Sequence, residues 1–315
     1  VGNIGVGGNG KTPFVISLVR ILKEAGYRVG IVSKGYGRRY PGTTVLVDHN
    51  MPASLVGDEV AMMWRHTNTV TALASKRSDA CRVLEAYGCD VIVCDDGLQD
   101  YSLNHDIEVL MYTDEGLGNK LLLPLGPLRE PLSRRKSVDY CVRQSIGQPH
   151  KNEQQLHQML YQIDSIYHHG TQEIMPHAKW QKMVKPVAIS AIGNPSRFQR
   201  LLIDANIDAK AINLPDHAKI ANEILQQHSQ STILITEKDA IKLTSSTQKN
   251  IWVVSIKVSF NTPILKSIVH RVSAHHTNRD KKQSSHLIND QNGHLDKPRT
   301  STAKQSTTNN HSTIA

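Results

Sequence analysis

Gly5-Val6-Gly7-Gly8-Asn9-Gly10-Lys11-Thr12 is the stretch of this sequence that decides the fold. It fits the pattern Gly-x4-Gly-Lys-Ser/Thr of a phosphate-binding P-loop, whose glycines let backbone N–H groups turn inward around phosphate oxygens. We therefore expect the whole stretch to bind a nucleotide. Lys11 is expected to place its charge on the β- and γ-phosphates during catalysis, and Thr12 to ligate Mg²⁺. The alternative is a glycine-rich turn that Lys-Thr follows by chance.

The residues after this loop indicate a helix and then a strand. Pro13 suits the first turn of a helix, and apolar residues recur at helical spacing from Phe14 to Leu22. A short strand over 27–33 follows, and such strand–loop–helix–strand units cross over right-handedly in a parallel sheet. The next loop, 34–40, mixes glycines, cations and tyrosines. It either grips an anionic group beside a ring or is a solvated turn.

A second acidic motif follows an apolar run. Residues 91–94 form a strand-like stretch that ends in Asp95-Asp96-Gly97. A buried strand that ends in Asp holds Mg²⁺ opposite the Ser/Thr of a P-loop enzyme, at the sheet edge where ligands bind. We therefore predict Asp95 and Asp96 as metal ligands, together with Thr12. The alternative is a common Asp-Asp-Gly turn.

Two further residues are candidates for acid–base chemistry. Asp58 precedes an apolar-periodic helix, so it either caps that helix or accepts a proton from an attacking hydroxyl. His217 follows Asp216 at the start of another helical pattern. It is either part of an acid–base pair or an ordinary residue at a helix start.

The order of the expected elements indicates an α/β protein with a P-loop NTPase-like, mostly parallel sheet flanked by helices. We expect a P-loop kinase core over 1–144, connecting hairpin or loop material over 145–185, and a second, smaller α/β half over 186–270. Residues 271–315 are rich in Ser, Thr, Asn, Gln, Lys and His and contain no aromatic residue. They are expected to be a disordered polar tail.

Composition narrows the partners. The net charge is +9, from 37 Lys and Arg against 28 Asp and Glu, which favours an anionic partner such as nucleic acid, a phosphorylated lipid or a membrane surface. Aromatic residues make up only 5%, and no nucleic-acid-binding motif is present. The four cysteines form no CxxC pair, which indicates a reducing compartment. Because the chain starts at Val1 in what resembles the end of a strand, we expect a segment to precede it.

Taken together, eight ordered blocks resemble the tetraacyldisaccharide 4'-kinases, the lipid A kinases of Gram-negative bacteria. The resemblance covers about residues 1–258 in collinear order. The blocks are 5–13, 33–38, 56–59, 95–99, 123–131, 192–195, 215–217 and 236–239.

This resemblance implies an enzyme that transfers the γ-phosphoryl of ATP, with Mg²⁺, to the 4'-hydroxyl of a tetraacyldisaccharide 1-phosphate to form lipid IVA. It implies that Asp58 is the base on the sugar hydroxyl and that His217 pairs with it. It places the enzyme on the cytoplasmic face of the inner membrane, at an anionic surface, either peripherally or through an N-terminal hydrophobic helix absent from this chain. The residues expected to contact the lipid are Tyr36, Arg38, Gln99 and Arg129.

The chain departs from the family pattern at two positions beside these blocks. Asp100 stands where many members have His, and Ala218 where a second His is frequent.

We predict no specific protein partner and no nucleic acid as a partner. One alternative is a P-loop ATPase of the partitioning or metallochaperone type, but such proteins carry an additional early lysine that residues 6–9 lack. Another is a basic nucleotide-binding regulator, which would not need Asp58, Asp95, Asp96 and His217 together.

Overall fold

The computed structural model describes residues 1–6, 10–39, 42–48, 51–146, 156–243 and 250–277. The strands are Gly2–Asn3 (β1), Val29–Ser33 (β2), Val45–Leu46 (β3), Thr71–Leu73 (β4), Val91–Cys94 (β5), Val109–Tyr112 (β6), Tyr140–Ile146 (β7), His157–His168 (β8), Val187–Ser190 (β9), Lys210–Asn213 (β10), Ile233–Thr236 (β11) and Ile251–Phe260 (β12).

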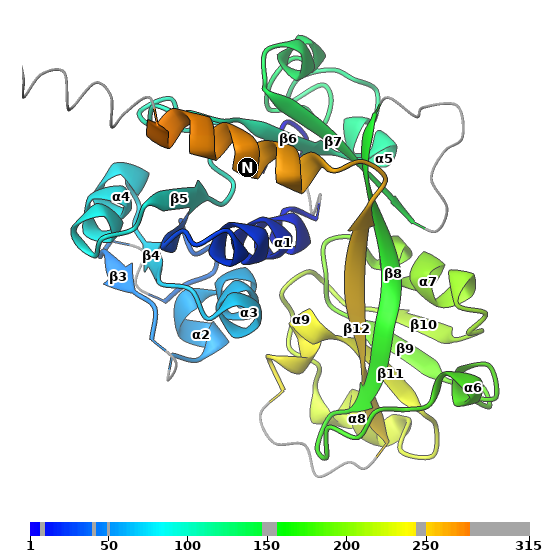
Figure 1. Ribbon diagram of the computed structural model, residues 1–315. Helices are drawn as coiled ribbons and strands as arrows, with labels where there is room; N and C mark the ends of the chain where they lie inside the picture. Colours follow the sequence, from blue (N-terminus) through cyan, green and yellow to red (C-terminus); the bar gives the residue numbers. More distant parts are fainter. Residues whose placement is uncertain (7–9, 40–41, 49–50, 147–155, 244–249, 278–315) are drawn as a thin grey trace, which may run out of the picture. The chain divides into compact units, whose positions relative to one another are not determined.

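The helices alternate with these strands along most of the chain (Figure 1). They are Lys11–Glu24 (α1), Ala53–Val56 (α2), Asp58–Thr67 (α3), Arg77–Ala86 (α4), Asp114–Leu117 (α5), His177–Trp180 (α6), Pro195–Asp204 (α7), Asn222–Gln227 (α8) and Glu237–Ala240 (α9), with a 3₁₀ turn at Leu132–Lys136.

The described strands form two sheets. The larger has the order β1-β6-β7-β8-β12-β11-β9-β10, and the smaller has the order β3-β4-β2-β5. Neighbours are parallel except for β8 with β12 and β3 with β4. The predicted fold class, a mostly parallel P-loop-type sheet with helices and a second α/β half, is confirmed. Backbone bonds link β1 to the end of β5, since the Gly97 amide donates to the Val1 carbonyl at 3.1 Å.

The long antiparallel ribbon of β8 and β12 was not predicted from the sequence, where the region 145–185 was expected to be connecting hairpin or loop material. The first residues of β8 pair with β7, and the first residues of β12 pair with β11. His168 at the end of β8 lies opposite Trp252 near the start of β12. The alternation of β8 is obscured because four consecutive residues, Gln158 to Tyr161, are buried, and Ile166 is the next buried residue of the strand. Its partner strand is also distant in the chain.

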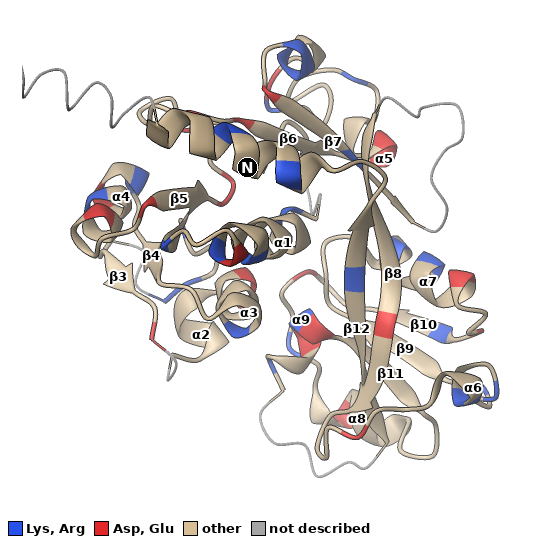
Figure 2. Cartoon of the chain, viewed as in Figure 1, with Lys and Arg blue, Asp and Glu red and all other residues tan. Residues whose placement is uncertain are grey.

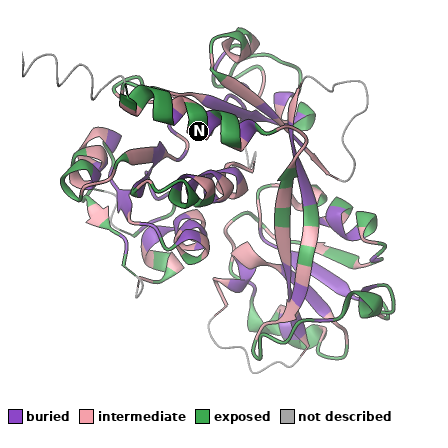
Figure 3. Cartoon of the chain, viewed as in Figure 1, coloured by how far each residue is buried: buried purple, intermediate pink, exposed green. Residues whose placement is uncertain are grey.

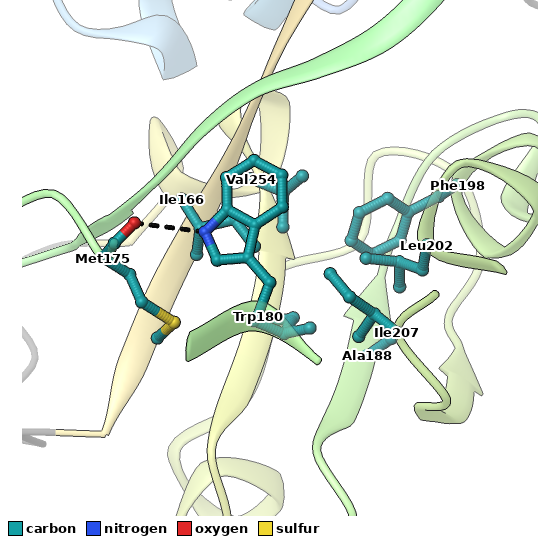
Figure 4. Packing of buried hydrophobic residues seen from close by; sticks show 9 residues of the cluster. Ile166, Met175, Trp180, Ala188, Phe198, Leu202, Ile207 and Val254 are labelled. Carbon is teal, nitrogen blue, oxygen red and sulfur yellow. Dashed lines mark hydrogen bonds between the residues drawn. The ribbon is translucent and has the colours of Figure 1, made fainter. Parts of the chain in front are cut away.

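The second half has its own apolar core. Trp180 packs among buried residues from α7, β9 and β12, and its indole nitrogen donates to the Met175 carbonyl at 3.1 Å (Figure 4). Figure 3 shows β9 and β11 largely buried. This core fixes the loops that follow β9 and β11. Those loops carry several residues of the site described below.

Residues 264–277 are helical, which corrects the expectation of disorder for 271–277. The sequence around Ile264 and Ile268 has apolar residues at a spacing of four, and both are buried. The polar segment 278–315 lies outside the described residues. In the part of the chain that the structure describes, no helix combines the length and the apolar character that crossing a membrane requires. All four cysteines are free thiols.

Candidate active site

The P-loop leads into α1 as the glycine pattern predicts. Gly10 has a left-handed backbone with φ 56° at the N-terminal end of α1. A Cβ there would collide with the Tyr161 hydroxyl and the Gln144 amide, so only glycine fits. Val6 donates its amide to the Pro127 carbonyl at 2.9 Å, which ties the loop to the segment 118–131. Gly7, Gly8 and Asn9 lie outside the described residues.

Lys11 and Asp96, which lie in two separate motifs of the sequence, contact each other in the structure. The Lys11 ammonium lies 3.0 Å from Asp96 Oδ1 and donates to Asn3 Oδ1 at 3.2 Å. Arg129 contacts the other oxygen of Asp96 at 3.4 Å. Burial acts to raise the pKa of Asp96, but Lys11 and Arg129 outweigh it and hold the pKa below its ordinary value.

Asp95 is buried beneath Asp96 and is poorly satisfied. The Ser33 hydroxyl donates to its Oδ2 at 3.2 Å, whereas its Oδ1 is buried and has no hydrogen-bond partner among the described residues. Burial raises the pKa of Asp95 to about 6, with Glu59 adding to the effect. A carboxylate oxygen that is buried without a donor fits a site for a hard cation such as Mg²⁺, together with Thr12 and Asp96.

No sequence pattern singles out Arg77, although this residue organises the acidic motif. Its guanidinium is buried and donates to the carbonyls of Asp95, at 3.1 Å, and Asp96, at 2.5 Å. It also pairs with Asp100 at 3.1 Å, the position that departs from the family pattern. Asp96 has a positive φ of 50°, which this clamp helps to hold. We call Asn3, Lys11, Arg77, Asp95 and Asp96 the P-loop cluster.

The structure brings Asp58 and His217 together. His217 Nδ1 lies 3.0 Å from Asp58 Oδ2, although the two residues are 159 positions apart. Asp58 is the first residue of α3, Gly57 occupies the cap position, and no described side chain caps this helix. The capping role considered for Asp58 is therefore not the one that the structure shows. The side chains of Asp58 and His217 are 13% and 32% exposed, so a substrate can reach the pair.

The Asp58–His217 pair is surrounded by further charges. Lys242 Nζ lies 3.7 Å from Asp58 Oδ2 and 2.9 Å from Asp239 Oδ1. Lys238 lies 3.6 Å from both Glu59 and Asp216. Acidic and basic residues thus lie side by side along α9 (Figure 2). We call Asp58, His217, Asp239 and Lys242 the Asp58 cluster.

A cavity of about 430 Å³ lies between these two clusters. Lys11, Thr12 and Asp96 line it on one side, and Glu59 and Asp216, the neighbours of Asp58 and His217, line it on the other. Asp58 and His217 lie just behind this lining. The cavity therefore lies beside both the P-loop cluster and the neighbours of the Asp58–His217 pair.

The four predicted lipid-contacting residues divide into two pairs. Tyr36, 79% exposed, and Arg129 line the cavity, and the Tyr36 ring lies 5.5 Å from the His217 ring. Arg38 is buried and donates to the Thr43 carbonyl and the Ser75 hydroxyl, and burial lowers its pKa. Gln99 donates to the Asn3 carbonyl and to Glu130. Arg38 and Gln99 therefore hold loops, and their contact with the lipid stays a prediction.

The basic run Arg134-Arg135-Lys136 makes most of its contacts within its own region of the chain. Arg134 forms ion pairs with Glu108, at 2.7 Å, and with Glu130, at 3.0 Å. Arg135 lies over the Tyr112 ring, 4.2 Å from its centroid. Two of the three cations thus stabilise the loop itself.

A second cavity, of about 530 Å³, lies beside the first and shares Asn194 and Arg197 with it. The ends of β6 and β7 and the helix α7 line it. Gln144 Nε2 and Ser145 Oγ are buried there without a hydrogen-bond partner among the described residues.

No group of three or more His, Cys, Asp or Glu side chains in the described part of the chain could hold a metal.

A P-loop that opens a helix, an aspartate-terminated strand beside its lysine, and an Asp–His pair across a shared cavity define a P-loop kinase. A family model described as tetraacyldisaccharide-1-P 4'-kinase matches residues 1–274. The chain belongs to the tetraacyldisaccharide 4'-kinase family.

Individual relatives agree with this assignment. The tetraacyldisaccharide 4'-kinase of Hahella chejuensis is 34% identical over 288 residues, which are 87% of this chain and 80% of that protein. Its counterpart from Vibrio cholerae is 36% identical over 278 residues, 86% of this chain and 80% of that protein. A crystal structure described as the "apo" form of LpxK from Aquifex aeolicus in complex with ATP has a TM-score of 0.66 and 26% identity, covering 86% of each chain.

Proposed function

We propose that this chain transfers the γ-phosphoryl of ATP to the 4'-hydroxyl of a tetraacyldisaccharide 1-phosphate, with the roles of individual residues given below. The family makes the chain an ATP-dependent kinase, a transferase that acts in lipid A biosynthesis. The comparisons give no support to a P-loop ATPase of the partitioning or metallochaperone type. The observation that carries the proposal is the 3.0 Å contact of Asp58 with His217 beside the cavity that Lys11 lines.

The nucleotide end of the reaction belongs to the P-loop cluster. Lys11 and the loop amides hold the β- and γ-phosphates, and Thr12, Asp95 and Asp96 hold Mg²⁺ when it binds with the nucleotide. Bound Mg²⁺ supplies positive charge that offsets the charge developing on the transferred phosphoryl group. Lys11 and Arg129 favour the ionised form of Asp96, so this carboxylate carries the negative charge that a cation needs.

Asp58 acts on the acceptor. Its carboxylate accepts the proton of the 4'-hydroxyl while that oxygen bonds to the γ-phosphorus and the bond from this phosphorus to the bridging oxygen of ADP breaks. His217 donates its Nδ1 proton to Asp58 Oδ2, which fixes the direction of the carboxylate and the tautomer of the ring. Transfer depends more on this positioning than on covalent assistance.

The second cavity suits the nucleoside end of ATP. It begins at Gly10 through Tyr161 and Gln144, and so continues from the phosphate loop. The buried amide of Gln144 and the hydroxyl of Ser145 offer hydrogen bonds to a base or ribose. We expect Gln144→Ala to raise the KM for ATP about tenfold with little change in kcat, and unchanged ATP kinetics would remove this assignment.

The lipid end has an apolar surface next to the P-loop. Leu121, Leu122, Leu123 and Leu125 are all about half or more exposed, in a segment fixed by backbone bonds to Leu128. Exposed leucines in such a cluster favour contact with acyl chains or a bilayer. We place the enzyme at the cytoplasmic face of the inner membrane. In a flotation assay with anionic vesicles, Leu123→Ser/Leu125→Ser should bind less lipid, while Ile203→Ser, at another exposed apolar position, should not differ from the unmodified chain.

The test of the reaction is transfer of label from γ-labelled ATP to a tetraacyldisaccharide 1-phosphate in detergent micelles with Mg²⁺. We expect Asp58→Asn to lower kcat by about a hundredfold or more while nucleotide binding is kept. Asp79→Asn, a surface carboxylate that pairs with Arg82 on α4, is the matched control. Free phosphate without labelled lipid would mean an ATPase, and full transfer by Asp58→Asn would remove Asp58 as the base.

A further inference from the structure

Lys242 follows α9 and is one of the most enclosed cations of the site, with a side chain only 7% exposed. A lysine ammonium is costly to bury unless several acceptors surround it. Here it donates to Asp239 Oδ1 at 2.9 Å and to the carbonyls of Ala191 and Ala218 at 3.1 and 3.3 Å. The ammonium is thus held in one place from three directions.

The anchor of this lysine is itself fixed. The side chain of Asp239 is fully buried. Its other oxygen, Oδ2, accepts from the Thr236 hydroxyl at 2.7 Å and from the Ala191 amide at 3.2 Å. Asp239 therefore joins the ends of β9 and β11, and Lys242 projects from this joint toward Asp58.

Lys242 also holds the backbone on which His217 is carried. The Ala218 carbonyl, which it binds, belongs to the residue after His217. The Ala191 carbonyl, which it also binds, accepts the amide of His217 at 3.2 Å. His217 has a positive φ of 62°, a conformation that a non-glycine residue keeps only when its surroundings impose it.

The same ammonium lies 3.7 Å from Asp58 Oδ2, the oxygen that His217 contacts. We propose that Lys242 is a positioning residue for phosphoryl transfer. It acts by holding the Asp58 carboxylate and the His217 loop in fixed positions relative to each other. This role rests on the proposed function, since it takes Asp58 as the base. Lys242 is not among the residues that line the cavity, whereas Lys11 and Thr12 of the P-loop are.

The other charged groups around the pair do not duplicate this role. Asp216 Oδ2 lies 3.6 Å from Nε2 of His217, the ring nitrogen that does not contact Asp58. Lys238 is balanced by Glu59 and Asp216 and lines the cavity. Within 4.0 Å of Asp58, the described cations and histidines are therefore Lys242 and His217.

Three variants separate positioning from mere support of the fold. Lys242→Met keeps the length of the side chain without its charge, Lys242→Arg keeps the charge, and Lys257→Met is a control lysine that pairs with Asp164 on the exposed side of the ribbon. For each, kcat and the KM values for ATP and lipid are measured in micelles. Thermal unfolding is recorded on the same samples.

We expect Lys242→Met to lower kcat at least about tenfold and to change the KM for ATP less than threefold, with Lys242→Arg restoring part of kcat. When Asp58→Asn is already present, adding Lys242→Met should lower kcat little further, because Lys242 acts through Asp58.

If Lys242→Met unfolds, Lys242→Met/Asp239→Asn removes both buried charges, and it should show the same loss of kcat. A normal kcat in either folded variant, while Asp58→Asn is inactive, would overturn the positioning role alone. Full activity of Asp58→Asn would overturn the proposed base and this role with it. Equal losses for Lys242→Met with and without Asp58 would also overturn it, since the lysine would then act independently of Asp58.

Discussion

The P-loop cluster and the Asp58 cluster each hold an aspartate beside a lysine, but they join very different parts of the chain. In the first, Lys11 reaches Asp96 at 3.0 Å within a strand–helix–strand framework built from β1, α1 and β5. In the second, α3 supplies Asp58, and the loops after β9, β10 and β11 supply its partners. Local motifs build the first cluster, whereas only tertiary packing builds the second. Mutations should therefore separate nucleotide binding from turnover.

The largest effect should come from Lys11→Ala, which removes the phosphate-binding charge and leaves Asp96 without its 3.0 Å partner. We expect transfer to fall by about a thousandfold and ATP to bind weakly, because both depend on the P-loop cluster. Labelled transfer and equilibrium nucleotide binding check this. Lys23→Ala on the same helix, whose ammonium contacts the Thr67 carbonyl, serves as control and should remain active.

His217→Ala should have the next largest effect, about a hundredfold on kcat, with nucleotide affinity unchanged. Asp58 and His217 act as a unit, so the double variant Asp58→Asn/His217→Ala should be no slower than Asp58→Asn within about threefold. Steady-state kinetics on the three variants measure this. Multiplicative losses would show that the 3.0 Å contact is not used in turnover.

Asp95→Asn should separate stability from function within the P-loop cluster. Burial raises the pKa of Asp95 to about 6 from an ordinary 3.8, so its ionised form destabilises the folded chain at neutral pH. We expect the variant to lose Mg²⁺-dependent transfer and to be more stable by about 2 kcal/mol at pH 7.5. Urea unfolding without nucleotide measures the difference.

The pH dependence of that difference is its control. Because the folded pKa lies above the unfolded one, the unmodified chain loses stability as pH rises from about 4 to 6 and regains it as pH falls. The gap between Asp95→Asn and the unmodified chain should therefore shrink at pH 5. A gap that is equal at pH 5 and pH 7.5 would assign the effect to the change of shape rather than of charge.

The smallest effect should distinguish Arg129 from Arg38. Arg129 lines the cavity and touches Asp96, so Arg129→Ala should raise the KM for the lipid about tenfold. Arg38 donates hydrogen bonds to the Thr43 carbonyl and to the Ser75 hydroxyl. Arg38→Ala should therefore lower the melting temperature and leave the KM for the lipid within twofold. Micelle kinetics and thermal unfolding of both variants decide between them.

The sequence predicted most of what local patterns determine. The P-loop, the helix after it and the strand before Asp95 follow from glycine placement and apolar spacing, which act over a few residues, although only Val93 of that strand is buried. The alternatives left open for Asp58 could not be settled in that way, because its partner is 159 positions away. Pairing with His217 came from family resemblance, which carries tertiary information that composition and periodicity do not.

Residues that act through burial were the ones missed. Arg77 is the first residue of an ordinary amphipathic helix, and nothing in the neighbouring sequence indicates that it binds the Asp95 and Asp96 carbonyls. Lys242 likewise looks like a surface lysine after a short helix, and only its enclosure by Asp239, Ala191 and Ala218 reveals its position. The strand β8 was missed because its partner β12 lies far along the chain.

The register of the β8–β12 ribbon has a consequence for the order of folding. His168 faces Trp252, so the whole stretch 169–250 leaves and rejoins the ribbon at one point. The entropy of closing a loop rises only slowly with its length, whereas long-range strand pairing is slow. We expect the second half, with its own core, to form first and to bring β8 and β12 together. On refolding from urea, fluorescence from Trp180 and Trp252 should then recover before phosphoryl transfer does, because the Asp58–His217 contact is made last.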